Sequence, residues 1–195
     1  MVTDKFELKD LSQDIPAALG EIERAAEFCK LSPEQVNVVR LLGEEMMSMT
    51  REILKGCSAE LWMENQKNRF EIHLSAKAMV DADAKKTFID LSSARKNTLP
   101  RGLKAKIAML FENFLFSDNQ AALIMPSMQY GFAGELPGTT AGAVWSMRNF
   151  NRNAPAEERD AALEGAEKSI LERFADDILV TVRLSEVELV CVKEF

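Results

Sequence analysis

The sequence predicts an α+β fold, namely a two-layer α/β sandwich with helices on one face of a mixed, mostly antiparallel sheet. Two observations lead to this prediction. Several segments repeat apolar residues at helical spacing, and two pairs of segments alternate apolar and polar residues around a short polar turn. The predicted order is strand, helix, helix, hairpin, helix, irregular segment, helix and hairpin. Paired strands separated by helices favour helices layered on one face of a sheet.

Composition limits the possible functions. The chain has 195 residues, 47% of them hydrophobic, and a net charge of −7. We expect a single domain over residues 1–195. Its negative charge argues against a nucleic-acid partner, because binding to phosphates needs a basic surface. No apolar run approaches the roughly 20 residues of a membrane helix, so we expect no membrane association.

The cysteines indicate a compartment. Cys29, Cys57 and Cys191 are odd in number and show no CxxC spacing, which is typical of a reducing environment. The N-terminus lacks a basic region followed by an apolar run, so no signal peptide is expected. These features predict a cytoplasmic protein.

A strand and a helix are expected first. Residues 6–9 alternate apolar and polar side chains, which favours a short strand. Asp14 is then a suitable cap for a helix that reaches Cys29. One face of this helix is apolar and contains Ile15, Leu19, Ile22, Ala26 and Cys29.

The second helix has signals at both ends. Ser32 is a suitable N-cap, Pro33 suits the first helical position, and Gln35 completes a capping box. Gly56 is a natural stop. At about 100° per residue, its apolar residues form one narrow stripe: Val39, Leu42, Met46, Met49 and Ile53.

A hairpin and a third helix should follow. Residues 59–64 and 70–75 are separated by the polar turn 65–68, and the second segment alternates strictly between apolar and polar residues. After Pro100, helical spacing returns at Leu103, Ile107, Leu110, Phe111 and Phe114.

Residues 117–155 are expected to be irregular. They contain four of the nine glycines and three prolines, and so long a loop usually marks a lid, an inserted segment, a binding loop or disorder. The residues expected to fix its end to the core are Trp145, Met147 and Phe150.

The last part of the chain predicts a helix and a second hairpin. Residues 156–174 have helical spacing. Residues 178–182 and 187–191 alternate apolar and polar positions and give the strongest hairpin signal in the sequence. The helical positions expected to face inward are Leu163, Ala166, Ile170 and Phe174.

The second helix resembles the first nucleotide-binding helix of the histidine kinase/Hsp90/gyrase-type ATPase superfamily, particularly the anti-sigma-factor kinases. The similarity lies in residues 31–34 followed by the pair Glu44 and Glu45. It implies a Bergerat-type ATPase fold, in which Glu45 matches the glutamate that activates the attacking group. The asparagine that holds Mg²⁺ in that family is replaced by Met49, and a thioether is a poor ligand for a hard cation.

Two further motifs of the family are altered here. The aspartate and glycine that bind adenine align with Ser75 and Lys77. The glycine-rich phosphate turn has a displaced counterpart between Gly138 and Gly142, whose backbone amides are suited to cradle phosphate. The resemblance therefore implies a degenerate ATP-binding site, with neither ATP nor a metal expected as cofactor.

Simpler interpretations stand beside these. Glu45 is also explained as an ordinary carboxylate at the boundary of an amphipathic helix, and the glycine-rich turn as a flexible loop. The methionines next to Glu45 are explained as core filler. His73, the only histidine, lies on the polar side of its strand and is expected at the surface. The seven basic residues within 85–106 suit a solvated face or a site for an anion or acidic partner.

Three functions are compatible with the sequence. The first is a non-catalytic (pseudo-ATPase) regulatory module of bacterial signalling, similar to an anti-sigma factor and acting on a protein partner. The second is a divergent serine kinase that uses ATP and Mg²⁺, with Glu45 as base and Gly138 and Gly142 near the phosphates. The third is a self-associating structural protein, for example a homodimer, that pairs an edge strand at residues 187–192 between copies.

Overall fold

The computed structural model of the chain describes residues 1–54, 57–77, 102–116, 130–132, 143–157, 159, 169–183 and 186–195. Its elements, in chain order, are β1 (Phe6–Leu8), α1 (Leu11–Phe28), α2 (Pro33–Ile53), β2 (Ser58–Gln66), β3 (Arg69–Lys77), α4 (Gly102–Phe116), β4 (Ala143–Ser146), α5 (Met147–Asn153), α7 (Ile170–Phe174), β5 (Asp177–Arg183) and β6 (Glu186–Glu194).

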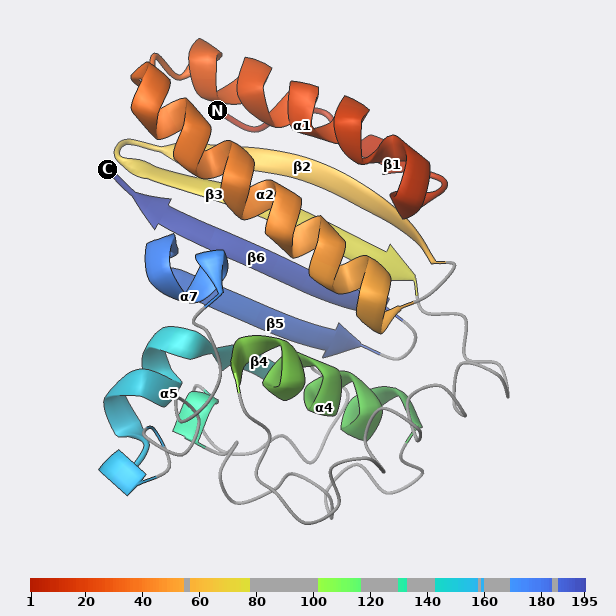
Figure 1. The fold of residues 1–195 in the computed structure, drawn as a ribbon, viewed down its shortest axis with the longest axis vertical. Coiled ribbons are helices and arrows are strands. Elements are labelled where there is room, and N and C mark those ends of the chain that lie inside the picture. The colour runs from red at the N-terminus through yellow and green to blue at the C-terminus, as the bar shows by residue number, and fades with distance from the viewer. Residues whose placement is uncertain are drawn as a thin grey trace.

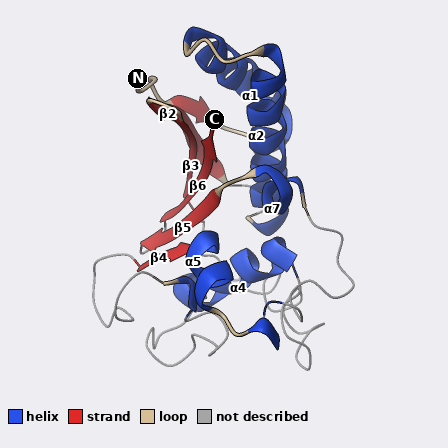
Figure 2. Cartoon of the chain, turned by 90° about the vertical axis from the view of Figure 1, so that its left-hand side faces the viewer, coloured by secondary structure: helices blue, strands red, loops and turns tan. Residues whose placement is uncertain are grey.

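The strands form one sheet in the order β1-β2-β3-β6-β5-β4, and α1 and α2 cross one face of it (Figure 1). Seen from the side, these helices stand on one side of the curved sheet (Figure 2). The predicted α+β class is therefore confirmed. Every pairing between the described strands is antiparallel, so the prediction of a mixed sheet was wrong for this part of the chain. The two hairpins meet through β3 and β6, which run in opposite directions.

Strand β6 lies in the middle of the sheet, between β3 and β5. Residues 187–192 were expected at an edge, and that expectation was wrong. The reason is that β6 pairs with β3 on one side and with β5 on the other. Both of its faces are buried as well: Leu189 and Cys191 face the helices, while Val190 and Val192 are buried on the opposite face. The outer strands are β1 and β4, which are only three and four residues long, as is common at sheet edges.

Helix α2 follows the sequence prediction closely. The backbone N–H of Gln35 donates to Ser32 Oγ at 3.3 Å, and the N–H of Ser32 donates to Gln35 Oε1 at 2.8 Å, which completes the capping box. The helix ends at Ile53, and Gly56 lies outside the described residues. The predicted apolar stripe is buried throughout, at Val39, Leu42, Met46, Met49 and Ile53.

A glycine sets the close contact between the two long helices. A Cβ atom added at Gly43 would lie 2.3 Å from Cδ1 of Ile22 in α1 and 3.7 Å from Cδ1 of Ile72 in β3. Only a residue without a side chain lets α2 approach Ile22 this closely, whereas the distance to Ile72 is an ordinary van der Waals contact. Helix α1 itself begins at Leu11, before Asp14, because the Asp14 carboxylate accepts the backbone N–H of Asp10 at 3.0 Å from within the first turn.

Regular structure extends into the segment that was predicted to be irregular. Residues 143–153 form β4 and α5, so the prediction for 117–155 was wrong at its C-terminal end. The short described segment 130–132 joins β4 through a bridge between Phe132 and Trp145. Residues 117–129 and 133–142 lie outside the described part. The expected anchors are confirmed as buried side chains, namely Trp145, Met147 and Phe150.

Helix α7 differs in phase from the predicted helix over 156–174. It has its own capping box, in which Ser169 and Glu172 exchange hydrogen bonds, so the turn starts anew at Ile170. Leu171 is consequently the fully buried residue. Ile170 and Phe174, which were expected to face inward, are 36% and 46% exposed. Residues 160–168, with Leu163 and Ala166, lie outside the described part.

Helix α4 places its predicted apolar positions inward wherever their burial is described. Leu103, Ile107 and Phe111 are all buried in the core. Its backbone begins next to α7, where the N–H of Leu103 donates to Glu172 Oε1 at 3.1 Å. Glu172 thus links the first turn of α4 to the capping box of α7.

Candidate functional site

The residue that the resemblance assigns to catalysis, Glu45, is bound to another helix. It lies in the middle of α2, and its Oε2 accepts the backbone N–H of Leu171 at 3.0 Å. This N–H belongs to the first turn of α7, where backbone donors have no partner within the helix. The carboxylate therefore completes the N-terminal cap of α7, together with Ser169 and Glu172.

The residue in place of the metal-binding asparagine is part of the core. Met49 is 6% exposed, and its neighbours Met46 and Met47 are buried as well. The interpretation of these methionines as core filler is thus confirmed. The next residue, Thr50, is buried and donates its hydroxyl to the backbone oxygen of Met46 at 2.8 Å, which satisfies it within α2.

The other predicted site residues do not join Glu45 among the described residues. Ser75 alternates with the core-facing Leu74 and Ala76, so it points to the sheet face away from α2. There its hydroxyl donates to Glu186 Oε1 at 2.7 Å. Glu45 and Ser75 thus lie on opposite sides of the sheet. Gly138 and Gly142 lie outside the described residues.

The basic stretch 85–106 is described only from residue 102 onward. Lys104 forms an ion pair with Glu52 of α2. Lys106 is buried, with its Nζ 3.9 Å from the ring centre of Phe150. Burial lowers the pKa of Lys106, and the negative charge of Glu172 partly opposes this shift. Both described lysines are thus in contact with the fold.

A second group of polar residues lies on the sheet face opposite the helices, around His73. Its side chain is only 11% exposed, so the expectation of a surface histidine was wrong. The ring stacks on Trp62 of β2, with the ring centres 4.8 Å apart and the planes inclined by 17°. These residues face each other directly in the β2–β3 register. The indole covers one side of the imidazole and removes it from water.

Three carboxylates surround this imidazole. Glu188 of β6 places Oε1 3.3 Å from Nδ1, while Nε2 lies 3.2 Å from Glu71 Oε2 and 3.8 Å from Glu64 Oε1. Burial by itself lowers the pKa of His73. The hydrogen bonds and charges of the three carboxylates outweigh burial and raise this pKa above its ordinary value.

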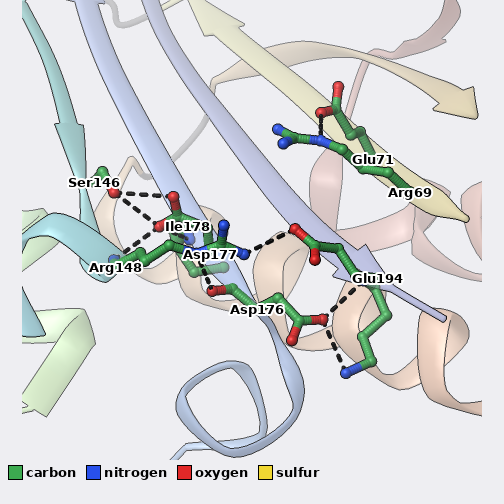
Figure 3. A network of polar contacts seen from close by, with 9 residues as sticks. Arg69, Glu71, Ser146, Arg148, Asp176, Asp177, Ile178 and Glu194 are labelled. Carbon is green, nitrogen blue, oxygen red and sulfur yellow. Dashed lines mark hydrogen bonds and ion pairs between the residues drawn. The ribbon is translucent and has the colours of Figure 1, made fainter. Parts of the chain in front are cut away.

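Neighbouring side chains hold two of these carboxylates in place. The indole N–H of Trp62 donates to Glu64 Oε1 at 3.3 Å. Arg69 donates to Glu71 Oε1 (Figure 3). The other oxygen of that carboxylate, Oε2, lies beside His73. We call His73, Glu64, Glu71 and Glu188 the His73 cluster. Its geometry is suited to binding a proton or a cation at the imidazole.

A third polar group joins α5 to the sheet. Asp177 accepts the hydroxyl of Ser146 at 2.9 Å, the backbone N–H of Arg148 at 2.9 Å and its neighbouring Ile178 N–H at 2.8 Å (Figure 3). The Arg148 guanidinium reaches Glu194 of β6 at 2.9 Å. These hydrogen bonds hold α5 and β6 against β5, so we assign this group a structural role.

The preceding residue, Asp176, links β5 to the end of β6. It accepts the backbone N–H of Glu194 at 2.7 Å and pairs with Lys193 Nζ at 3.0 Å. Burial alone raises the pKa of Asp176, but the Glu194 N–H and the charges of Lys193 and Arg148 hold it below its usual value.

Sequence reasoning missed the His73 cluster, although its signal was present. A two-residue turn at 67–68 places Glu64 opposite Glu71 and Trp62 opposite His73. What the β2–β3 hairpin alone could not supply was Glu188, which comes from β6, more than 100 residues later.

Comparison of the sequence with models of known protein families gave no match, and comparison with curated proteins gave none either. Within the described part of the chain, every helix is too short or too polar to cross a membrane.

Proposed function

We propose that this protein is a non-catalytic regulatory module: a degenerate Bergerat-type ATPase fold, similar to anti-sigma factors, that acts through protein contacts in the bacterial cytoplasm. The observation that carries the proposal is the hydrogen bond from the Leu171 backbone N–H to Glu45 Oε2. A general base needs a free carboxylate within reach of the proton it removes. Here the corresponding carboxylate caps α7.

The position expected to supply the Mg²⁺ ligand also lacks a suitable side chain. Met49 offers a thioether packed into the core, and a buried thioether does not replace an amide oxygen on Mg²⁺. A Bergerat-type scaffold agrees with the helices on one face of the sheet (Figure 2) and with the path of α2 across the middle of that face (Figure 1). The loss of both functional groups on α2 supports a scaffold without turnover.

Two further features support a role in protein contacts within the cytoplasm. Each of α1, α2 and α7 exposes a large apolar side chain, namely Phe28, Leu41 and Phe174. Apolar side chains at the surface are a common component of partner interfaces. All three cysteines are free thiols, which agrees with a reducing compartment.

The experiment is a thermal unfolding assay of the full chain with ATP and Mg²⁺ together, with Mg²⁺ alone as control. A ligand that binds the folded state must raise the melting temperature. We expect the two melting temperatures to agree. An increase of several degrees that requires ATP would overturn the non-catalytic assignment and favour the divergent kinase.

The alternative of self-association through the strand at residues 187–192 does not agree with this fold. It required residues 187–192 at an edge, whereas β6 is paired on both sides. We therefore expect light scattering to give the mass of one chain at micromolar concentration. A dimer mass would call for another interface.

A further inference from the structure

The geometry points to a divalent metal site in the His73 cluster, with Nε2 of His73 and one carboxylate oxygen each from Glu64 and Glu71 as ligands. These three atoms all lie within 4.8 Å of one another. They come from β2 and β3, at positions that alternate with core-facing residues, and so lie on the sheet face opposite α1 and α2. The proposed ion is zinc, and the site is independent of the function proposed above.

The distances from Nε2 of His73 to the two carboxylate oxygens are close to what zinc requires. Zinc bonds to nitrogen and oxygen of about 2.1 Å in a tetrahedron place neighbouring ligand atoms about 3.4 Å apart. Nε2 of His73 is 3.2 Å from Glu71 Oε2 and 3.8 Å from Glu64 Oε1. These two separations lie on either side of that value. Because the Glu64 side chain is 28% exposed, water can supply the fourth ligand.

An independent observation concerns the other nitrogen of the imidazole. Nδ1 of His73 faces Glu188 Oε1 at 3.3 Å. When Nδ1–H donates to this carboxylate, Nε2 is left with its lone pair toward Glu64 and Glu71. Metal-bound histidines in proteins almost always have such a carboxylate or carbonyl partner on the second nitrogen.

The two carboxylate ligands are also oriented from outside. Trp62 donates to Glu64 and Arg69 donates to Glu71. The ammonium group of Lys5 lies over the ring of Trp62 and forms an ion pair with Glu60 at 2.7 Å. The three carboxylates of the His73 cluster gather around one imidazole, and this concentration of acidic groups suits a dication.

The donor set selects among metals. One imidazole and two carboxylates suit zinc, whereas Mg²⁺ and Ca²⁺ prefer oxygen ligands alone. The inferred preference is therefore for Zn²⁺ over both of these ions.

The test is isothermal titration of the full chain with Zn²⁺ in a Cys29→Ser background. This background removes the partly exposed thiol, while Cys57 and Cys191 are buried. We expect one zinc ion per chain. Millimolar Mg²⁺ or Ca²⁺ should leave the zinc affinity unchanged. Absence of zinc binding in this background would overturn the site.

Substitutions of the proposed ligands test whether zinc binds at the His73 cluster. His73→Gln and Glu64→Gln should each weaken zinc binding at least tenfold. Glu188→Gln, which removes only the partner of Nδ1, should weaken it about 10–100-fold. Glu60→Gln is the matched control, because Glu60 lies on the same strand and face as Glu64 but binds Lys5, and it should change affinity less than twofold.

Folding is checked by circular dichroism and thermal unfolding of each variant. Glu64→Gln keeps the size of a partly exposed side chain, so it remains a fair test if His73→Gln does not fold. Zinc binding to folded Glu64→Gln with the parent affinity would refute the proposal.

Discussion

Glu45 and Leu171 are joined by a hydrogen bond of 3.0 Å that spans 126 residues of sequence. It connects the middle of the longest described helix, α2, to the first turn of α7. The bond gives Glu45, at the boundary of the apolar face of α2, a structural role as a cap of α7. A capping role predicts that substitution of Glu45 lowers the stability of the protein, which unfolding experiments can measure.

Replacing Glu45 by alanine should destabilise the protein by about 1–2 kcal/mol, because a partly buried backbone N–H of α7 loses its charged acceptor. Urea unfolding measures this difference. The matched control is Glu44→Ala, which removes an exposed carboxylate 3.6 Å from Arg40 and should change the free energy of unfolding by less than about 0.5 kcal/mol. Equal effects of the two substitutions would contradict the capping role.

The prediction at Met49 concerns the core of α2. Met49→Asn, which restores the amide of the related ATPases, should cost about 2–4 kcal/mol because it buries an amide among apolar side chains. Met49→Leu preserves volume and apolar character, and should cost less than about 1.5 kcal/mol. Urea unfolding compares the two. An asparagine tolerated as well as leucine would mean that a polar partner is within reach of this position.

Much of α2 and of both hairpins follows from local sequence. The signals at Ser32, Pro33 and Gln35 act within one turn, and the apolar stripe has the period of the helix itself. Alternation likewise assigned the faces of β3, because side chains on a strand point to opposite sides in turn.

What could not be predicted depends on contacts between distant segments. The central place of β6 follows from its pairing with β3, and sequence alternation does not say which strands become neighbours. His73 was assigned to the polar face correctly, but its burial results from Trp62 and from Glu188 on another strand. The same holds for Glu45, whose partner Leu171 is distant in sequence.

A close packing contact gives a further prediction. A Cβ atom at Gly131 would lie 1.9 Å from the indole nitrogen of Trp145, and the buried ring is too rigid to move aside. Gly131→Ala should therefore destabilise the protein by about 1–3 kcal/mol. The control is Gly20→Ala in α1, where the nearest atom is the end of Arg24 at 3.6 Å.

Gly20→Ala should raise stability by up to about 1 kcal/mol, because alanine favours a helix interior over glycine. Thermal unfolding should therefore give a lower melting temperature for Gly131→Ala and a higher one for Gly20→Ala than for the parent. A Gly131→Ala protein as stable as the parent would show that the Trp145 ring can shift.

Asp176 should make stability depend on pH in the acid range. Its folded-state pKa is lowered, so the carboxylate stabilises the fold above its unfolded pKa of about 3.9 and loses that contribution as the pH falls through the folded value. Urea unfolding of the parent and of Asp176→Asn should differ most near neutral pH. The difference should shrink below about pH 4. A difference that stays constant with pH would exclude this carboxylate as the source.

The position of β6 has a consequence for the time at which the protein can fold on the ribosome. The sheet is continuous only through residues 186–194, since β1, β2 and β3 lie on one side of this strand and β5 and β4 on the other. A nascent chain that has not yet released these residues from the exit tunnel holds two partial sheets with open inner edges. Assembly of the native sheet must therefore await the release of residues 186–194, and until then such edges are natural targets for chaperones.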